Sequence, residues 1–285
     1  MKISAPLLLL LLGSTLAGGC SVGAHVAAGY TQVAVSGDLG LTTGTGGVTN
    51  VQDIEPAFGL GDDQGSPYVR AEADLGFARL TGSAFRFEEN GEGVIDGAFG
   101  NIPSGTQTRS NLEFTNLKAS LGFDFGIGPV SVSPGLALEV FDMQFVARDP
   151  VSQATEEFDD VLFLPLLNLG AEVELFGLAV AAEIGYLNTP EIDNAETEVL
   201  DFEAMLRWDF GSNLGVFVGY RYIDLQGEGE TGGDSVDVNF QVSGWTIGGM
   251  LRYVPIAPQA DAISRPVCVN VPTSLRDAAK RATVE

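Results

Sequence analysis

A period-two alternation of apolar and polar residues recurs along most of the chain. In residues 115–126, Leu, Ala and Phe occupy every second position, with Asn, Lys, Ser, Gly and Asp between them. Alternation of this kind predicts a β-strand with one apolar and one polar face. The predicted strands, in chain order, are residues 29–41, 68–74, 77–88, 115–126, 130–145, 161–175, 178–187, 199–210, 214–225 and 236–254.

The connections between these strands alternate in length. Short turns rich in Gly are predicted at residues 75–76, 127–129, 176–177 and 211–213. Longer polar connections are predicted at residues 42–66, 89–110, 147–157, 188–196 and 226–234. Transmembrane β-barrels have short turns on one side and long loops on the other, and bacterial forms have an even number of strands. A soluble β-sandwich could show the same alternation of polarity, but nothing in its fold requires short and long connections to alternate along the chain.

The last predicted strand, residues 236–254, changes phase within its length. Val236, Val238, Phe240 and Val242 share one face. After Gly244 the apolar set becomes Trp245, Ile247, Leu251 and Tyr253. A Gly at such a phase change predicts a β-bulge.

The end of this stretch resembles the terminal signal of bacterial outer-membrane β-barrels, which the barrel-assembly machinery reads. Thr246, Gly248, Leu251 and Tyr253 occupy its four specified places, although 32 residues follow Tyr253 where the family usually ends. Gly219–Tyr222 also looks like a tetrapeptide of small barrels of this kind. The resemblance covers residues 29–253. It implies an all-β fold: a transmembrane antiparallel up-and-down β-barrel of about ten strands, with eight as the alternative, in the outer membrane of a Gram-negative-type bacterium.

Aromatic residues gather at two levels of the predicted strands, as the two girdles of a membrane barrel do. The first level, near the short turns, comprises Phe77, Phe123, Phe125, Phe176, Trp208 and Tyr253. The second level, near the long loops, comprises Tyr68, Phe141, Phe163, Tyr186, Tyr220, Tyr222 and Phe240.

The N-terminus has the form of an export signal, which we assign to residues 1–19. Lys2 precedes an apolar stretch, residues 6–12, that is too short to span a bilayer. Residues 16–20, Leu-Ala-Gly-Gly-Cys, resemble the bacterial lipoprotein box, in which Cys20 would be lipidated. The alternative is ordinary cleavage near Gly19 or Ala24. The predicted organisation continues with a periplasmic linker, residues 20–28, and the barrel, residues 29–254.

Residues 255–285 are predicted to be a periplasmic tail. Four prolines favour an extended first part, and residues 274–282 could form a short helix with Ser274 and Asp277 as its capping box. A solvated tail is favoured over a wall or partner contact. Cys268 could pair with Cys20 in an oxidising compartment, but lipidation of Cys20 would prevent this.

Composition limits the partners. The formal net charge is −24 with only 14 basic residues among 285, which disfavours nucleic-acid binding because that requires a basic face. The expected partners are outer-membrane lipid and, during biogenesis, the barrel-assembly machinery. We expect a monomer without a cofactor, and nothing in the sequence identifies an extracellular partner.

The sequence also disfavours an enzyme. Proteases of the barrel class use His with Asp, and the phospholipases use Ser with His. The only His here is His25, which precedes the first predicted strand on the periplasmic side. No His-based catalytic set or metal cluster of Cys and His is therefore expected.

The polar faces of the strands predict a charged lumen. Its predicted bases are Arg70, Lys118, Arg207, Arg221 and Arg252, with Arg79 as a further candidate, and its predicted acids are Glu72, Asp74, Asp124, Glu139, Glu172, Glu174, Glu183, Asp201, Glu203 and Asp209. We favour a filled lumen and a structural or surface-interaction role, because a ten-stranded barrel is barely wider than those that side chains fill. The alternative is a narrow cation-preferring channel. A barrel that binds a small apolar ligand would need an apolar lumen, which the alternation does not predict.

Overall fold

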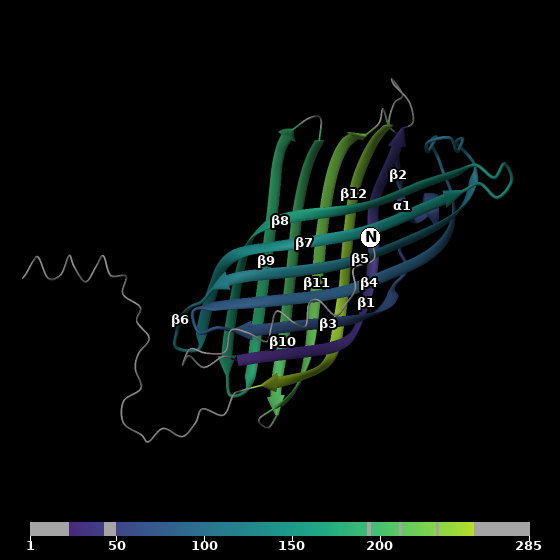
Figure 1. Cartoon of the computed structure of the whole chain (residues 1–285). Coiled ribbons are helices and arrows are strands. Elements are labelled where there is room, and N and C mark those ends of the chain that lie inside the picture. Colours follow the sequence, from purple (N-terminus) through teal and green to yellow (C-terminus); the bar gives the residue numbers. More distant parts are fainter. Residues whose placement is uncertain (1–22, 43–49, 193–194, 211–212, 232–233, 254–285) are drawn as a thin grey trace, which may run out of the picture. The chain divides into compact units, whose positions relative to one another are not determined.

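The predicted strands form one closed antiparallel β-barrel (Figure 1). This computed structural model describes residues 23–42, 50–192, 195–210, 213–231 and 234–253. Ten long strands make the wall: β1 (Gly23–Thr42), β3 (Gln64–Asp74), β4 (Ala78–Val94), β5 (Gln107–Phe123), β7 (Val130–Arg148), β8 (Thr155–Leu175), β9 (Leu178–Ile192), β10 (Ala195–Phe210), β11 (Leu214–Thr231) and β12 (Asp234–Tyr253). The ten-strand alternative is therefore the one adopted.

The barrel is closed by the first and last strands. β12 pairs with β1 from Ala24↔Tyr253 to Thr42↔Ser235, so the polar groups of the backbone are satisfied around the ring. Three short elements complete the described chain: β2 (Val51–Asp53) beside β1, β6 (Phe125–Ile127) beside β7, and α1 (Ile54–Phe58). Among the described residues, no helix is long and apolar enough to cross a membrane.

The strands are longer than the alternation predicted. β1 begins at Gly23, so residues 23–28 belong to the barrel wall and not to a linker. Most of residues 188–196 and 226–234 extend β9, β10, β11 and β12, where long loops were expected. These segments were interpreted as loops because most of their residues are polar or Gly. The proposed signal, Cys20, Cys268 and the tail lie outside the described residues.

The polarity of the wall inverts along the barrel. Toward the short turns the outward side chains are apolar and the inward ones charged, whereas toward the loop end the inward side chains are apolar and the outward ones polar. β12 shows the change without a bulge: Phe240 and Val242 lie inside, and Trp245 and Ile247 lie outside, in one continuous register. The predicted bulge at Gly244 is thus wrong. A Cβ on Gly244 would lie 2.5 Å from the Gln32 carbonyl oxygen, so this Gly permits close approach of β1.

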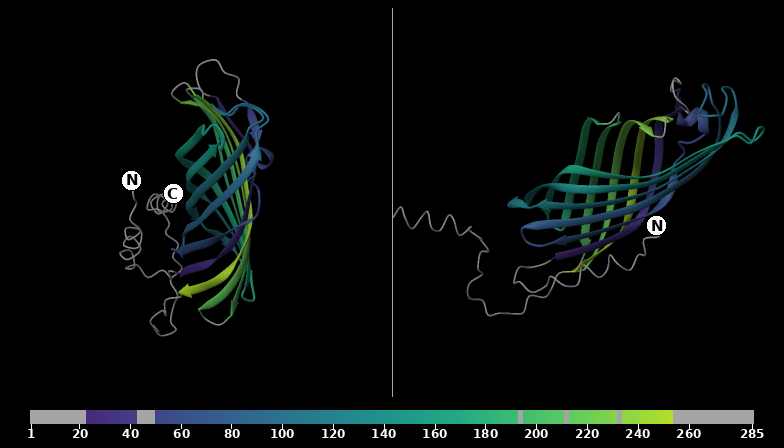
Figure 2. Two further views of the ribbon diagram at one scale, coloured as in Figure 1. Left: turned by 90° about the vertical axis from the view of Figure 1, so that its right-hand side faces the viewer. Right: turned by 45° about the horizontal axis from the view of Figure 1, so that its top comes forward.

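The wall divides at two places toward the loop end. β8 and β9 pair only from Leu167↔Tyr186 to Leu175↔Leu178, and β3 and β4 pair only from Tyr68↔Phe85 downward. Beyond these levels, β4, β5, β7 and β8 continue as one sheet, and β9 to β12 with β1 continue as another. Figures 1 and 2 show the teal strands β7 and β8 diverging from the green strands β9 to β11.

Candidate functional site: the lumen of the barrel

A buried ionic cluster lies at mid-height of the lumen. Arg221 on β11 donates from Nε to Asp201 Oδ1 at 3.1 Å and from Nη2 to Glu139 Oε1 at 2.6 Å. Lys118 on β5 donates to Asp201 Oδ2 at 2.6 Å and pairs with Glu183 at 2.8 Å. Glu139 and Asp201 are fully buried, so their charges depend on these cations and not on water.

A second cluster lies beside the first and joins the opposite wall. Glu203 on β10 accepts hydrogen bonds from the Tyr68 hydroxyl at 2.6 Å and from Arg70 Nη1 at 2.8 Å, both on β3. Arg70 also lies 3.7 Å from Glu72 and from Glu183. The two hydrogen bonds to Glu203 cross the lumen between residues 135 and 133 positions apart, so they hold β3 against β10 through the interior.

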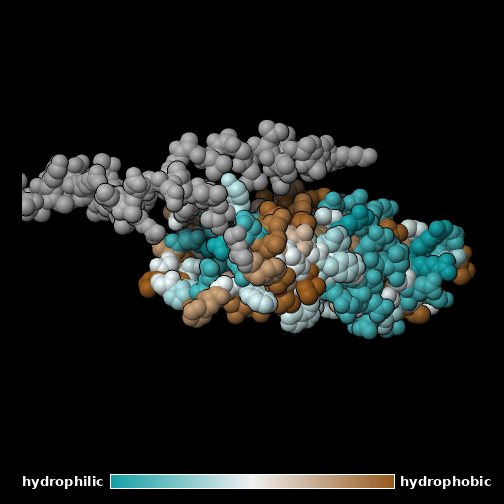
Figure 3. Space-filling view, turned by 90° about the horizontal axis from the view of Figure 1, so that it is seen from below, coloured by the Kyte–Doolittle hydropathy of each residue, from teal (hydrophilic) through white to brown (hydrophobic). Residues whose placement is uncertain are grey.

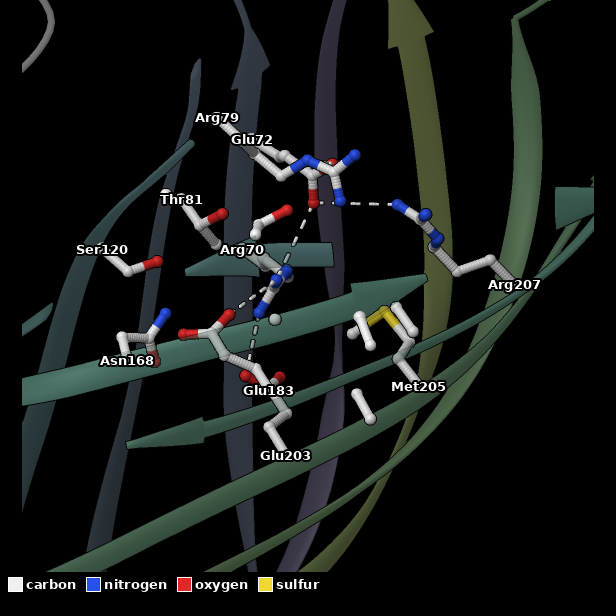
Figure 4. Close-up of a pocket in the computed structure, with 16 residues that line it drawn as sticks. Arg70, Glu72, Arg79, Thr81, Ser120, Asn168, Glu183, Glu203, Met205 and Arg207 are labelled. Atoms are coloured by element: carbon white, nitrogen blue, oxygen red, sulfur yellow. Dashed lines mark hydrogen bonds and ion pairs between the residues drawn. The ribbon is translucent and has the colours of Figure 1, made fainter. Parts of the chain in front are cut away.

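A third cluster occupies the short-turn end, and Figure 4 shows two of its arginines, Arg79 and Arg207, with Glu72. Arg79 Nη1 lies 2.6 Å from Glu172 Oε2, and Arg79 Nε lies 3.1 Å from Asp74 and 3.6 Å from Asp124. Arg207 pairs with the other oxygen of Glu172. At the rim Arg252 pairs with Asp209 at 3.1 Å. Glu174, two residues after Glu172 on β8, is exposed and has no ion pair among those found in the described chain.

His25 lies within the barrel wall and not before it. It is half-buried in β1, and its Nδ1 is 3.5 Å from Arg207 Nη1 in the third cluster. The prediction that His25 lies outside the barrel is therefore wrong, because β1 starts six residues earlier than its alternation indicated. His25 remains at the short-turn end, far along β1 from the loops.

Little space is left between the charged groups. The cavity lined by Arg70, Glu72, Arg79, Glu203 and Arg207 has a volume of about 40 Å³. A water molecule needs about 10–15 Å³ measured in this way, so the cavity has room for a few waters. Among the described residues, no group of three or more His, Cys, Asp or Glu side chains is arranged to hold a metal ion.

An apolar layer fills the lumen beyond the ionic clusters. We call it the phenylalanine core; it consists of Phe58, Phe85, Phe87, Phe99, Phe114, Phe141, Phe145 and Phe240. The ring of Phe114 is fully buried and lies 5.1 Å from Phe87 and 5.8 Å from Phe85 and from Phe240, between centroids. Arg221 lies 5.4 Å from the Phe85 ring, where the two layers meet. The apolar lumen that the alternation did not predict therefore exists, but phenylalanine side chains occupy it.

Helix α1 covers the phenylalanine core and fills the split between β3 and β4. The ring centroid of its C-terminal residue, Phe58, lies 5.0 Å from that of Phe145. The Thr108 hydroxyl donates to the Ala57 carbonyl at 2.8 Å, and Glu89 accepts from the Asp62 N–H at 2.9 Å. A Cβ on Gly93 would lie 2.4 Å from Ala57, so Gly lets α1 rest directly on β4.

Sequence reasoning missed this covering segment. Phe58 and Phe99 were assigned to polar connections because they do not alternate with polar neighbours. A usable signal was their size, since large aromatic side chains in exported loops need a surface to pack against.

The outer surface carries an apolar belt, shown in brown in Figure 3, beside the hydrophilic surface of the loop end. Large exposed apolar side chains on every strand of the wall form it; representative members are Val26, Val69, Leu80, Leu121, Leu136, Leu167, Val180, Trp208, Val216 and Ile247. Of the second predicted aromatic level, Phe163 and Tyr186 are exposed, but Tyr68, Phe141 and Phe240 point inward. That girdle is thus smaller than predicted, because the inversion of polarity places those three residues in the lumen.

The four residues of the terminal signal divide between the two faces of β12. Thr246 is buried and donates to the Thr31 hydroxyl at 2.9 Å, and Gly248 faces the same side. Leu251 and Tyr253 are more than half exposed on the outer face. Met250, between them, is buried in the lumen.

A closed barrel of ten antiparallel strands with an exposed apolar belt is the form of the bacterial outer-membrane β-barrels. Solved structures similar to this chain are of that class. The outer membrane protease OmpT from Escherichia coli has a TM-score of 0.48 and 9% identity, over 85% of this chain and 99% of that chain. The translocator domain of the autotransporter NalP from Neisseria meningitidis has a TM-score of 0.42 and 13% identity, over 86% and 93%.

The attachment invasion locus protein Ail of Yersinia pestis has a TM-score of 0.37 and 11% identity, over 82% of this chain and all of that chain. No protein-family model matches the sequence, and no curated protein sequence matches it.

Proposed function

We propose that this protein is a non-conducting outer-membrane barrel with a structural or surface-interaction role, displayed through its acidic loop end. The observation that supports this proposal is that two layers of packed side chains follow one another along the lumen. Ions would meet the ionic clusters around Arg70, Arg79 and Arg221, and then the phenylalanine core beneath α1. A non-enzymatic role is supported by His25, whose ring contacts an arginine at the end of the barrel farthest from the loops.

The alternative is a narrow cation-preferring channel. It is favoured by one observation, the surplus of carboxylates over arginine and lysine in the lumen, which would select cations if water were continuous.

Planar-bilayer recording of the purified barrel distinguishes the two. We expect no discrete openings from the wild type or from Arg70→Ser, because the phenylalanine core still closes the lumen. Val151→Ala, at an exposed position of the β7–β8 turn, is the matched control. Discrete openings of the wild type whose size or cation preference changes in Arg70→Ser, but not in Val151→Ala, would establish the channel instead.

A further inference from the structure

The two splits in the barrel wall differ in what fills them. The split between β3 and β4 is occupied by α1 and bridged by Ser66, whose hydroxyl accepts the Arg86 N–H at 3.1 Å. The split between β8 and β9 begins above Leu167↔Tyr186, where β8 continues beside β7 alone and β9 beside β10 alone. Within the described chain, no helix or strand occupies this second split. We call it the β8–β9 fork.

The β8–β9 fork carries an apolar hollow. The hollow has a volume of about 540 Å³, which lies in the range of about 300–1,000 Å³ typical of ligand pockets. Its lining joins the outside of the wall to the inside. Leu136, Leu138 and Leu167 are exposed members of the apolar belt, whereas Leu166 and Leu187 point toward the lumen.

The fork also leaves apolar side chains incompletely packed. Leu187 on β9 and Leu162 on β8 contact the phenylalanine core layer yet are only partly buried. Phe114 and Ile223, which also face inward, are by contrast fully buried. Leu187 therefore lies partly exposed beside exposed leucines of the belt, and a contiguous exposed apolar patch of this kind marks a binding surface.

We propose that the β8–β9 fork binds a hydrocarbon chain of an outer-leaflet lipid, which enters from the side and packs against Leu187 and the exposed leucines of the hollow. The occupant follows from continuity: three leucines that line the hollow belong to the belt that we take to face lipid, so its mouth opens into bilayer hydrocarbon. The fork lies toward the loop end, which corresponds to the outer leaflet. The chemistry is that of a flexible alkyl chain, because most of the lining is aliphatic. This goes beyond the proposed function, which does not require a ligand.

Photocrosslinking from lipid tests the proposal. The barrel would be reconstituted in vesicles of phosphatidylethanolamine and phosphatidylglycerol containing a trace of phospholipid with a diazirine on one acyl chain. Labelled residues are then located by mass spectrometry. We expect Leu187, which faces inward, to be labelled at least as strongly as belt residues such as Val216. Contact with the belt alone cannot label an inward residue.

Two outward alanines provide matched variants. Ala119→Phe would fill the hollow from the belt side, and we expect it to reduce labelling of Leu187 several-fold. Ala28→Phe makes the same change on β1, away from the fork, and should leave that labelling unchanged. Heat-modifiable gel mobility verifies that both variants are folded. Labelling confined to outward residues, or labelling of Leu187 that Ala119→Phe does not reduce, would overturn the proposal.

Discussion

At the scale of single residues, the lumen contains arginines that each form ion pairs with more than one carboxylate. Arg221 holds both Asp201 and Glu139, and Arg79 holds both Asp74 and Glu172. Removing one partner of a buried ion pair costs more than the pair contributes, because the remaining charge stays buried. Exposed pairs, such as that of Arg86 with Glu113, are worth about 0–1 kcal/mol.

Arg221→Ala is therefore expected to lower the free energy of unfolding by about 3–5 kcal/mol, because Glu139 and Asp201 lose their shared cation. Arg86→Ala, the control, should lower it by no more than about 1 kcal/mol. Urea unfolding in phospholipid vesicles, followed by the fluorescence of Trp208 and Trp245, measures both. An equal decrease in the free energy of unfolding in the two variants would show that Arg221 stabilises the barrel no more than an exposed arginine does.

The charges of the lumen could be listed from parity alone, but their partners could not. Tyr68 and Glu203 meet at 2.6 Å across 135 residues of sequence. Which strand faces which across a barrel depends on its tilt and stagger, and no local pattern encodes these quantities. Phe58 and Phe99 were missed for a related reason, since they lie outside the alternating strands.

At the scale of elements, alternation predicted the existence and order of the strands but not their ends or the inversion of polarity. When the apolar face passes from inside to outside, the apolar positions shift by one residue just as they would at a bulge, so β12 looked bulged although its pairing is continuous. Only the environment beyond the wall distinguishes the two faces, and that environment changes where the strand leaves the apolar belt.

The closing strand provides a test of the terminal signal. We expect Tyr253→Ala to lower the amount of assembled barrel, because Tyr253 occupies the last place of the terminal signal. Tyr253 is exposed, so such a loss would not come from packing inside the lumen. Met250→Gln, at a buried lumen position of similar size, should assemble like the wild type. Heat-modifiable mobility of outer-membrane fractions reports assembly. If Met250→Gln lowered the amount of assembled barrel and Tyr253→Ala did not, a signalling role for Tyr253 would be refuted. Gly248 is unsuitable here, because any Cβ would lie 2.4 Å from the Ala28 carbonyl oxygen.

At the scale of the whole molecule, the barrel has two ends of different character. The short-turn end has a belt outside and charges inside, whereas the loop end resembles a soluble protein, with an apolar core and a polar surface. This arrangement predicts that the loop end stands in water outside the cell.

Single cysteines test this orientation. A cysteine at Asp62 or Val151, both exposed at the loop end, should react with an impermeant thiol reagent on intact cells. A cysteine at Ile127, the exposed last residue of β6, should react only after the outer membrane is permeabilised. Labelling of Ile127→Cys alone on intact cells would reverse the orientation.

The phenylalanine core has a consequence for biogenesis. Its member Phe240 comes from β12, as does the neighbouring Val242, and its neighbours Val33 and Val35 come from β1. The core therefore cannot be completed until the first and last strands have paired. Until then the core remains incomplete, and part of its aromatic surface is exposed while the chain is in the periplasm. We therefore expect a chain built in this way to need protection from aggregation in the periplasm more than a barrel of equal size whose outer loops are wholly polar.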